Sequence, residues 1–61
     1  MAQITEKELG ALSDLLTMEE NMIAKYGKMA TDTTDTSLKG CYEQMASKHR
    51  QHYDALASNL K

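Results

Sequence analysis

The stretch TDTTDTS, residues 31–37, decides the fold of this 61-residue chain. It is built of Thr, Asp and Ser, whose side chains bind nearby backbone groups and therefore favour caps and turns over helix interiors. The chain contains no Pro that would interrupt a helix on either side. We therefore predict an all-α protein in which residues 1–61 form a single hairpin, with a helix over 5–31, a loop over 32–35 and a helix over 36–60.

Both predicted helices carry a start signal and an apolar stripe. Thr5 followed by Glu8 is a capping box. Asp35 is the best N-cap for the second helix, with Thr34 and Thr36 as alternatives. The stripe residues step by three and four, which is the spacing of one helix face. They are Leu9, Leu12, Leu16, Glu19, Ile23, Tyr26 and Ala30 in the first helix, and Leu38, Tyr42, Met45, His49, His52, Leu56 and Leu60 in the second.

The positions of these stripes predict an antiparallel register, because residues at equal distances from the centre of a hairpin face each other. Six pairs lie at equal distances from Thr34: Leu12 with Leu56, Leu16 with His52, Glu19 with His49, Ile23 with Met45, Tyr26 with Tyr42, and Ala30 with Leu38. The same rule sets Gly27 opposite Cys41. There we expect Gly27 to permit close helix approach. Cys41, the only cysteine, is expected to be a buried thiol, with an intermolecular crosslink as the alternative.

A chain of this length buries barely enough surface to fold alone. Leu15, Met22 and Met29 widen the first stripe beyond what one partner helix covers. We therefore expect two hairpins to pair as a homodimer, forming a four-helix bundle with a two-fold axis.

Three polar side chains interrupt the apolar stripes: Glu19, His49 and His52. One interpretation is structural, with Glu19 hydrogen-bonded to His49 to fix the register, in which case we expect no cofactor. A second is a metal site of these three residues, for Zn²⁺ or iron, since imidazoles with a carboxylate suit such ions better than Mg²⁺ or Ca²⁺. A third is a stripe edge wetted by solvent. His52 is expected to face Leu16, with no polar neighbour in its own hairpin.

The composition argues against several classes of function. The net charge is −2 and the basic residues are scattered among acids, so we expect no nucleic-acid partner. Apolar runs fall well short of the roughly 18 residues of a membrane span, and MAQITEKEL lacks the apolar core of a signal peptide. We therefore expect synthesis in the cytoplasm. No nucleophile with a supporting base stands out, so we expect no enzyme activity, and the methionines are expected to be core filler.

The order and spacing of several motifs resemble the short Coat F-like spore coat proteins of endospore-forming bacteria. The resemblance covers nearly the whole chain. It rests on Met18-Glu19 ahead of Lys25-Tyr26, on Asp35-x-x-Leu38-Lys39, and on His49-x-x-His52-Tyr53 before Leu56.

This resemblance implies a ferritin-like bundle and a structural protein of the spore coat, whose partners are copies of itself and other spore coat proteins. It also implies that Glu19, Tyr26 and His52 correspond to residues of ferritin-like di-iron sites. His49 stands where those enzymes have a bridging Glu, which argues against iron oxidase chemistry. The alternatives are a ferritin-like metal-binding protein and an adaptor that adds its hairpin to the bundle of another protein.

Overall fold

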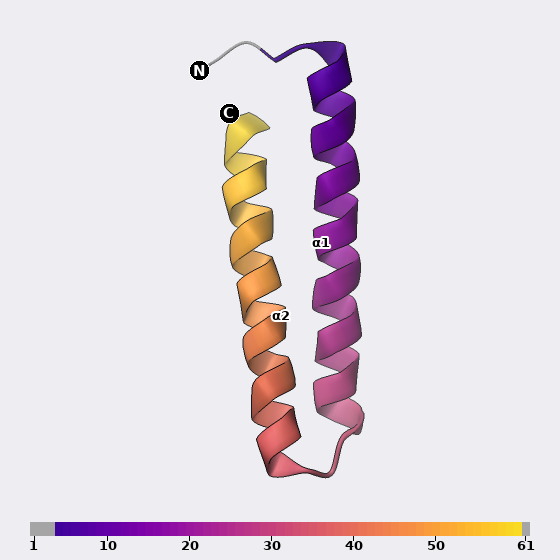
Figure 1. Cartoon of the computed structure of the whole chain (residues 1–61), viewed down its shortest axis with the longest axis vertical. Coiled ribbons are helices and arrows are strands. Elements are labelled where there is room, and N and C mark those ends of the chain that lie inside the picture. The colour runs from indigo at the N-terminus through magenta and orange to yellow at the C-terminus, as the bar shows by residue number, and fades with distance from the viewer. Residues whose placement is uncertain (1–3, 61) are drawn as a thin grey trace.

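The computed structural model describes residues 4–60, which form two antiparallel helices and no strand (Figure 1). Helix α1 spans Glu6–Asp32 and helix α2 spans Thr36–Ala57, followed by a turn of 3₁₀ helix, η1, at Ser58–Leu60. The hairpin is a narrow rod with principal dimensions of 46 × 16 × 10 Å. The helical hairpin predicted from the sequence is confirmed. In the part of the chain just described, neither helix combines the length and the apolar character needed to cross a membrane.

Side-chain caps start both helices. The Thr5 hydroxyl accepts a hydrogen bond from the backbone N–H of Glu8 at 3.1 Å, and the Glu8 carboxylate accepts one from the backbone N–H of Thr5 at 3.1 Å. The Asp35 carboxylate accepts a bond from the backbone N–H of Leu38 at 2.9 Å. Each cap satisfies N–H groups that have no partner within the helix. Both predicted caps are therefore confirmed.

Side chains bind backbone carbonyls at the C-terminal ends of both helices, where the sequence carries no strong stop signal. The Lys39 ammonium of α2 donates to the carbonyl of Ala30 at 3.2 Å, which places a cation at the C-terminal end of α1. The α-helical part of α2 ends at Ala57, earlier than the predicted helix over 36–60. There the Ser58 hydroxyl donates to the carbonyl of Ala55 at 2.6 Å, and Asn59 binds the same carbonyl at 3.3 Å. Such side chains compete with the helical hydrogen-bond pattern.

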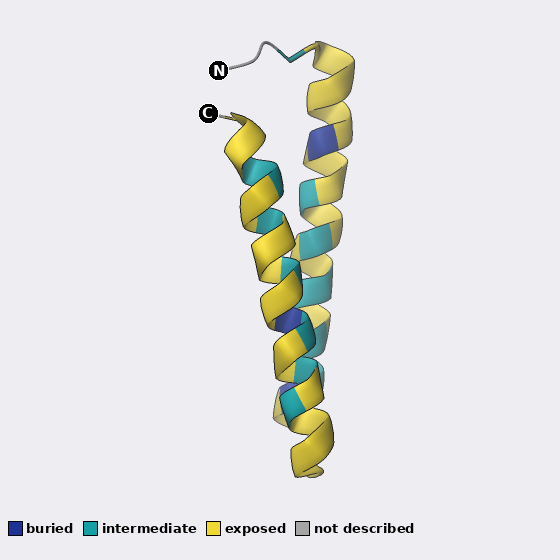
Figure 2. Ribbon diagram, turned by 60° about the vertical axis from the view of Figure 1, so that its left-hand side comes forward, coloured by how far each residue is buried: buried dark blue, intermediate teal, exposed yellow. Residues whose placement is uncertain are grey.

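The core of the hairpin is small. Leu12, Ala30 and Ala46 are the buried residues among those that the structure describes. Most other stripe residues are only half-buried, and they lie along the facing sides of the two helices (Figure 2). Large apolar side chains also remain exposed: Leu9, Leu15, Met18, Leu38 and Leu60. Each helix has one partner helix, which is too little to enclose the wide stripes.

Two predictions about the flanks of the stripes are wrong. A Cβ atom added at Gly27 would meet no atom within 4 Å, so this glycine does not mark a close approach between α1 and α2. Cys41 is exposed rather than buried. Both errors have the same physical reason, because residues beside the facing stripe have no second helix to pack against.

We expect the substitution Thr5→Ala to raise the pKa of Glu8. The hydrogen bond from the Thr5 side chain, followed by the bond from its backbone, holds this pKa below its ordinary value. Because the pKa is lower in the folded than in the unfolded chain, the ionised carboxylate stabilises the fold above the unfolded pKa. That contribution is lost as the pH falls through the folded pKa.

An NMR titration of the Glu8 side chain measures this effect. The control is Thr17→Ala, since the Thr17 hydroxyl binds the carbonyl of Ser13 and takes no part in the cap. Identical Glu8 titrations in the wild type and in Thr5→Ala would contradict the assignment.

Candidate metal centre

The middle of the hairpin brings the three predicted site residues together. Glu19 lies on α1, and His49 and His52 lie three residues apart on one face of α2. One ligand atom from each residue lies within 4.8 Å of the others. The predicted register is confirmed at the Glu19–His49 layer, which is hydrogen-bonded, and at the layer of Tyr26 and Tyr42, whose ring centroids are 6.3 Å apart.

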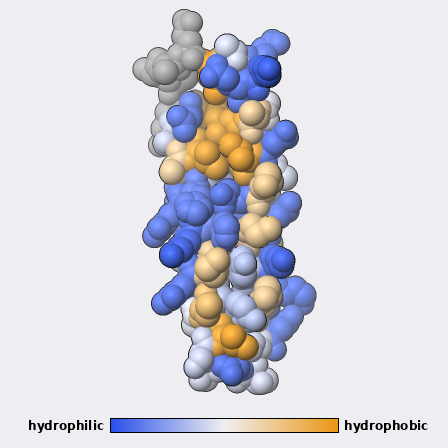
Figure 3. Space-filling model, in the orientation of Figure 1, coloured by the Kyte–Doolittle hydropathy of each residue, from blue (hydrophilic) through white to orange (hydrophobic). Residues whose placement is uncertain are grey.

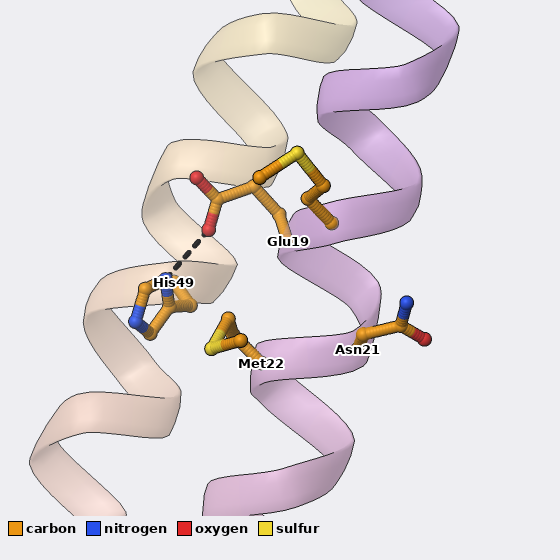
Figure 4. A pocket seen from close by; sticks show the side chains of 5 residues that line it. Glu19, Asn21, Met22 and His49 are labelled. Carbon is orange, nitrogen blue, oxygen red and sulfur yellow. Dashed lines mark hydrogen bonds and ion pairs between the residues drawn. The ribbon is translucent and has the colours of Figure 1, made fainter.

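A short hydrogen bond between Glu19 and His49 joins the two helices (Figure 4). The His49 Nδ1 atom lies 2.6 Å from the Glu19 Oε1 atom, and each side chain is 20% exposed. An ionised carboxylate can only accept, so Nδ1–H is the donor. The imidazole also stacks on Tyr26, with ring centroids 5.7 Å apart and planes 7° from parallel. The ring of His49 is therefore held in place from two directions.

His52 also turns towards Glu19, although it was predicted to face Leu16 with no polar neighbour in its own hairpin. Its Nδ1 atom lies 3.6 Å from the Glu19 Oε2 atom, and its side chain is 59% exposed. Its ring meets that of His49 edge to face at 5.6 Å. That prediction is wrong because helical side chains tilt towards the N-terminus of their helix. On α2 this tilt carries the imidazole of His52 back to the layer of Glu19.

A shallow pocket of about 320 Å³ lies beside the Glu19–His49 pair. Its lining consists of Met18, Glu19, Asn21, Met22 and His49. Figure 4 shows Met22 reaching towards His49, whereas Asn21 points away from it. Met18 is 60% exposed and is not core filler in the hairpin, contrary to expectation. The sequence placed Met22 beside the stripe, but the pocket itself had no recognisable signal.

The chemistry of this cluster is that of one carboxylate between two imidazoles. Each oxygen of the Glu19 carboxylate faces a different histidine: Oε1 lies near Nδ1 of His49, and Oε2 lies near Nδ1 of His52. Such a group exists in two forms: a His49–Glu19 hydrogen bond with the imidazole of His52 beside it, or a set of three ligands around a divalent ion. Two metals in one site need bridging carboxylates, and Glu19 is the only carboxylate in this group.

Comparisons of the chain with protein-family models, with curated proteins and with solved structures find no match. The likeness to the Coat F-like proteins therefore stays a prediction from the sequence. The correspondence of Glu19, Tyr26 and His52 to residues of ferritin-like sites stays a prediction as well. The interpretation of the cluster rests on its own geometry.

We expect a double-mutant cycle of Glu19→Ala and His49→Ala to give a coupling free energy of about 1 kcal/mol, the scale of a partly exposed hydrogen bond to a charged group. The matched control is Lys28–Asp32, an ion pair at 3.0 Å whose side chains are 78% and 60% exposed. For such an exposed pair we expect about 0.3–0.5 kcal/mol.

Denaturant unfolding at one fixed protein concentration measures both cycles. A Glu19–His49 coupling no larger than that of the control would mean that this bond does not join the helices.

Proposed function

We propose that this chain is a structural subunit that pairs with a second copy into a four-helix bundle, and that the bundle is a building block of a spore coat. On this proposal the chain is synthesised in the cytoplasm and then added to the coat, where its partners are copies of itself and other coat proteins. It acts through packing of helix faces and not as an enzyme.

The observation that carries the pairing is the surface area of the hairpin. The accessible surface is 4779 Å² for a chain of 6.8 kDa. A compact folded protein of this mass exposes about 3,950 Å². The excess of about 800 Å² matches what one partner buries in an interface of standard size. A second copy therefore supplies the missing cover.

One flank of α1 is the best candidate for this interface. Leu15, Met18, Met22 and Met29 follow each other at helical spacings and lie on the same side of α1. Leu15 and Met18 are 45% and 60% exposed. Figure 3 shows a further group of apolar side chains between the helices, near the end of the hairpin where α1 begins and η1 ends. A two-fold pair of hairpins would bury such surfaces against each other.

We expect the untagged protein to sediment at twice the mass of the chain at micromolar concentration. Leu15→Glu and Met18→Glu place a charge on the proposed interface and should each raise the dissociation constant of the dimer at least tenfold. The control is Ala24→Glu, because Ala24 is exposed on the opposite flank of α1.

Circular dichroism verifies that each variant keeps its helix content. A stable, folded wild-type monomer at micromolar concentration, or a dimer that ignores both interface substitutions, would overturn the pairing.

The coat assignment is supported by the resemblance of the sequence and needs its own test. We expect a fluorescent fusion of the chain, produced in a sporulating endospore-forming bacterium, to form a ring around the spore. The dimer-breaking variant Leu15→Glu should reduce this ring, whereas Ala24→Glu should not. A fusion that stays diffuse through sporulation would contradict the assignment.

The alternative function is a ferritin-like metal-binding protein with a Glu/His site in the bundle core, and its di-metal form has less support. Two paired hairpins would offer two Glu19 carboxylates and four imidazoles, whereas di-iron bundles use additional bridging Glu residues. The resemblance to the Coat F-like proteins implies that His49 stands at the position of such a Glu. We therefore do not propose oxidase activity.

A further inference from the structure

We infer that Glu19, His49 and His52 form a site for one transition-metal dication of the Zn²⁺ type, complete within a single hairpin. All three ligands come from one chain, so the site does not require the proposed dimer.

The spacing of the ligand atoms suits one ion. In a tetrahedral zinc site with bonds of about 2.0–2.1 Å, neighbouring ligand atoms are about 3.3 Å apart. Here the two Nδ1 atoms lie at 2.6 Å and 3.6 Å from the nearest carboxylate oxygens, which brackets this value. The three ligand atoms lie within 4.8 Å of one another. An ion that binds between them therefore requires the His49–Glu19 pair to open and the other ligand atoms to draw closer.

The site is ordered on one side and open on the other. His49 is fixed by its stacking on Tyr26, and Glu19 is four-fifths buried. Preorganised ligands of this kind lose little conformational freedom on binding. His52, with 59% of its side chain exposed, gives the ion a path from solvent. Three protein ligands also leave a fourth tetrahedral position for water.

The ligand set selects the class of ion. Two imidazoles favour Zn²⁺, Co²⁺, Ni²⁺ or Cu²⁺ over Mg²⁺ and Ca²⁺, which prefer oxygen ligands. Binding through Nδ1 of His49 displaces the proton that this atom shares with Glu19. The proton then sits on Nε2 of the same ring, so the ligand is a neutral imidazole. Protons compete with the ion for imidazole nitrogens, and binding therefore weakens as the pH falls.

Equilibrium dialysis of the untagged protein against Zn²⁺ tests the site directly. We expect one ion per chain, a higher melting temperature with Zn²⁺, and no competition from excess Mg²⁺. Co²⁺ alone should develop the visible absorption bands of a tetrahedral complex. An unchanged melting temperature at saturating Zn²⁺, or one ion per two chains, would overturn a site complete within the hairpin.

Three ligand variants and one control identify the residues. Glu19→Gln, His49→Gln and His52→Gln should each weaken Zn²⁺ binding at least tenfold, whereas Glu20→Gln, the exposed neighbour of Glu19, should bind like the wild type. His52→Gln is decisive because 59% of the His52 side chain is exposed, so the substitution removes a ligand with little loss of packing. Zn²⁺ binding by His52→Gln equal to that of the wild type would overturn the proposal. Sedimentation of the same variants without metal separates a failure of this site from a failure of the dimer.

Discussion

Each helix of this protein has one partner helix, and the rest of the structure follows from that constraint. One partner helix covers a helix face about as wide as itself, but the apolar residues of α1 spread over more than one face. The outcome is a hairpin in which Leu12, Ala30 and Ala46 are the buried residues of the described chain, while Leu15 and Met18 stay in solvent. Burial of three side chains, two of them alanines, stabilises a fold weakly. Association with a second copy is the simplest way to add the missing burial.

The same constraint keeps the polar layer of Glu19 and His49 partly exposed. In a fully enclosed core, a carboxylate and an imidazole would carry a large desolvation cost. Here Glu19 and His49 are each 20% exposed, so they keep part of their hydration while the surrounding side chains exclude most of the water that would compete for their hydrogen bond. Such a bond contributes specificity as well as stability, because a shift of α2 along α1 would leave both groups without a partner. The layer thus sets the register that the apolar residues, which tolerate sliding, define only loosely.

The helix caps and the Glu19–His49 layer were predictable from the sequence. The Thr5–Glu8 and Asp35 caps need groups only three residues apart, and the Glu19–His49 layer follows from equal distances to the loop. The rest depends on how each helix is rotated and in which direction each side chain tilts. The stripes are too wide to fix that rotation, which is why the exposure of Met18 and Cys41 and the burial of Ala46 were not anticipated. The position of His52 was predicted wrongly because its side chain tilts along the axis of α2 into the neighbouring layer, whereas the register considers only residues that face each other within one layer.

The open histidine links the two proposals physically. Helical spacing places His52 on the same side of the hairpin as Met18 and Met22, the residues of the apolar flank that line the pocket beside His49. A second hairpin docked on this flank would remove water from His52, and its imidazole would then depend on a polar partner, either the carboxylate of Glu19 or a bound ion, since a buried polar group without a partner costs free energy. By reciprocity, an ion that holds His52 against Glu19 would preform part of that interface. Assembly and metal binding, although carried by different residues, would then favour each other through the single side chain that faces both.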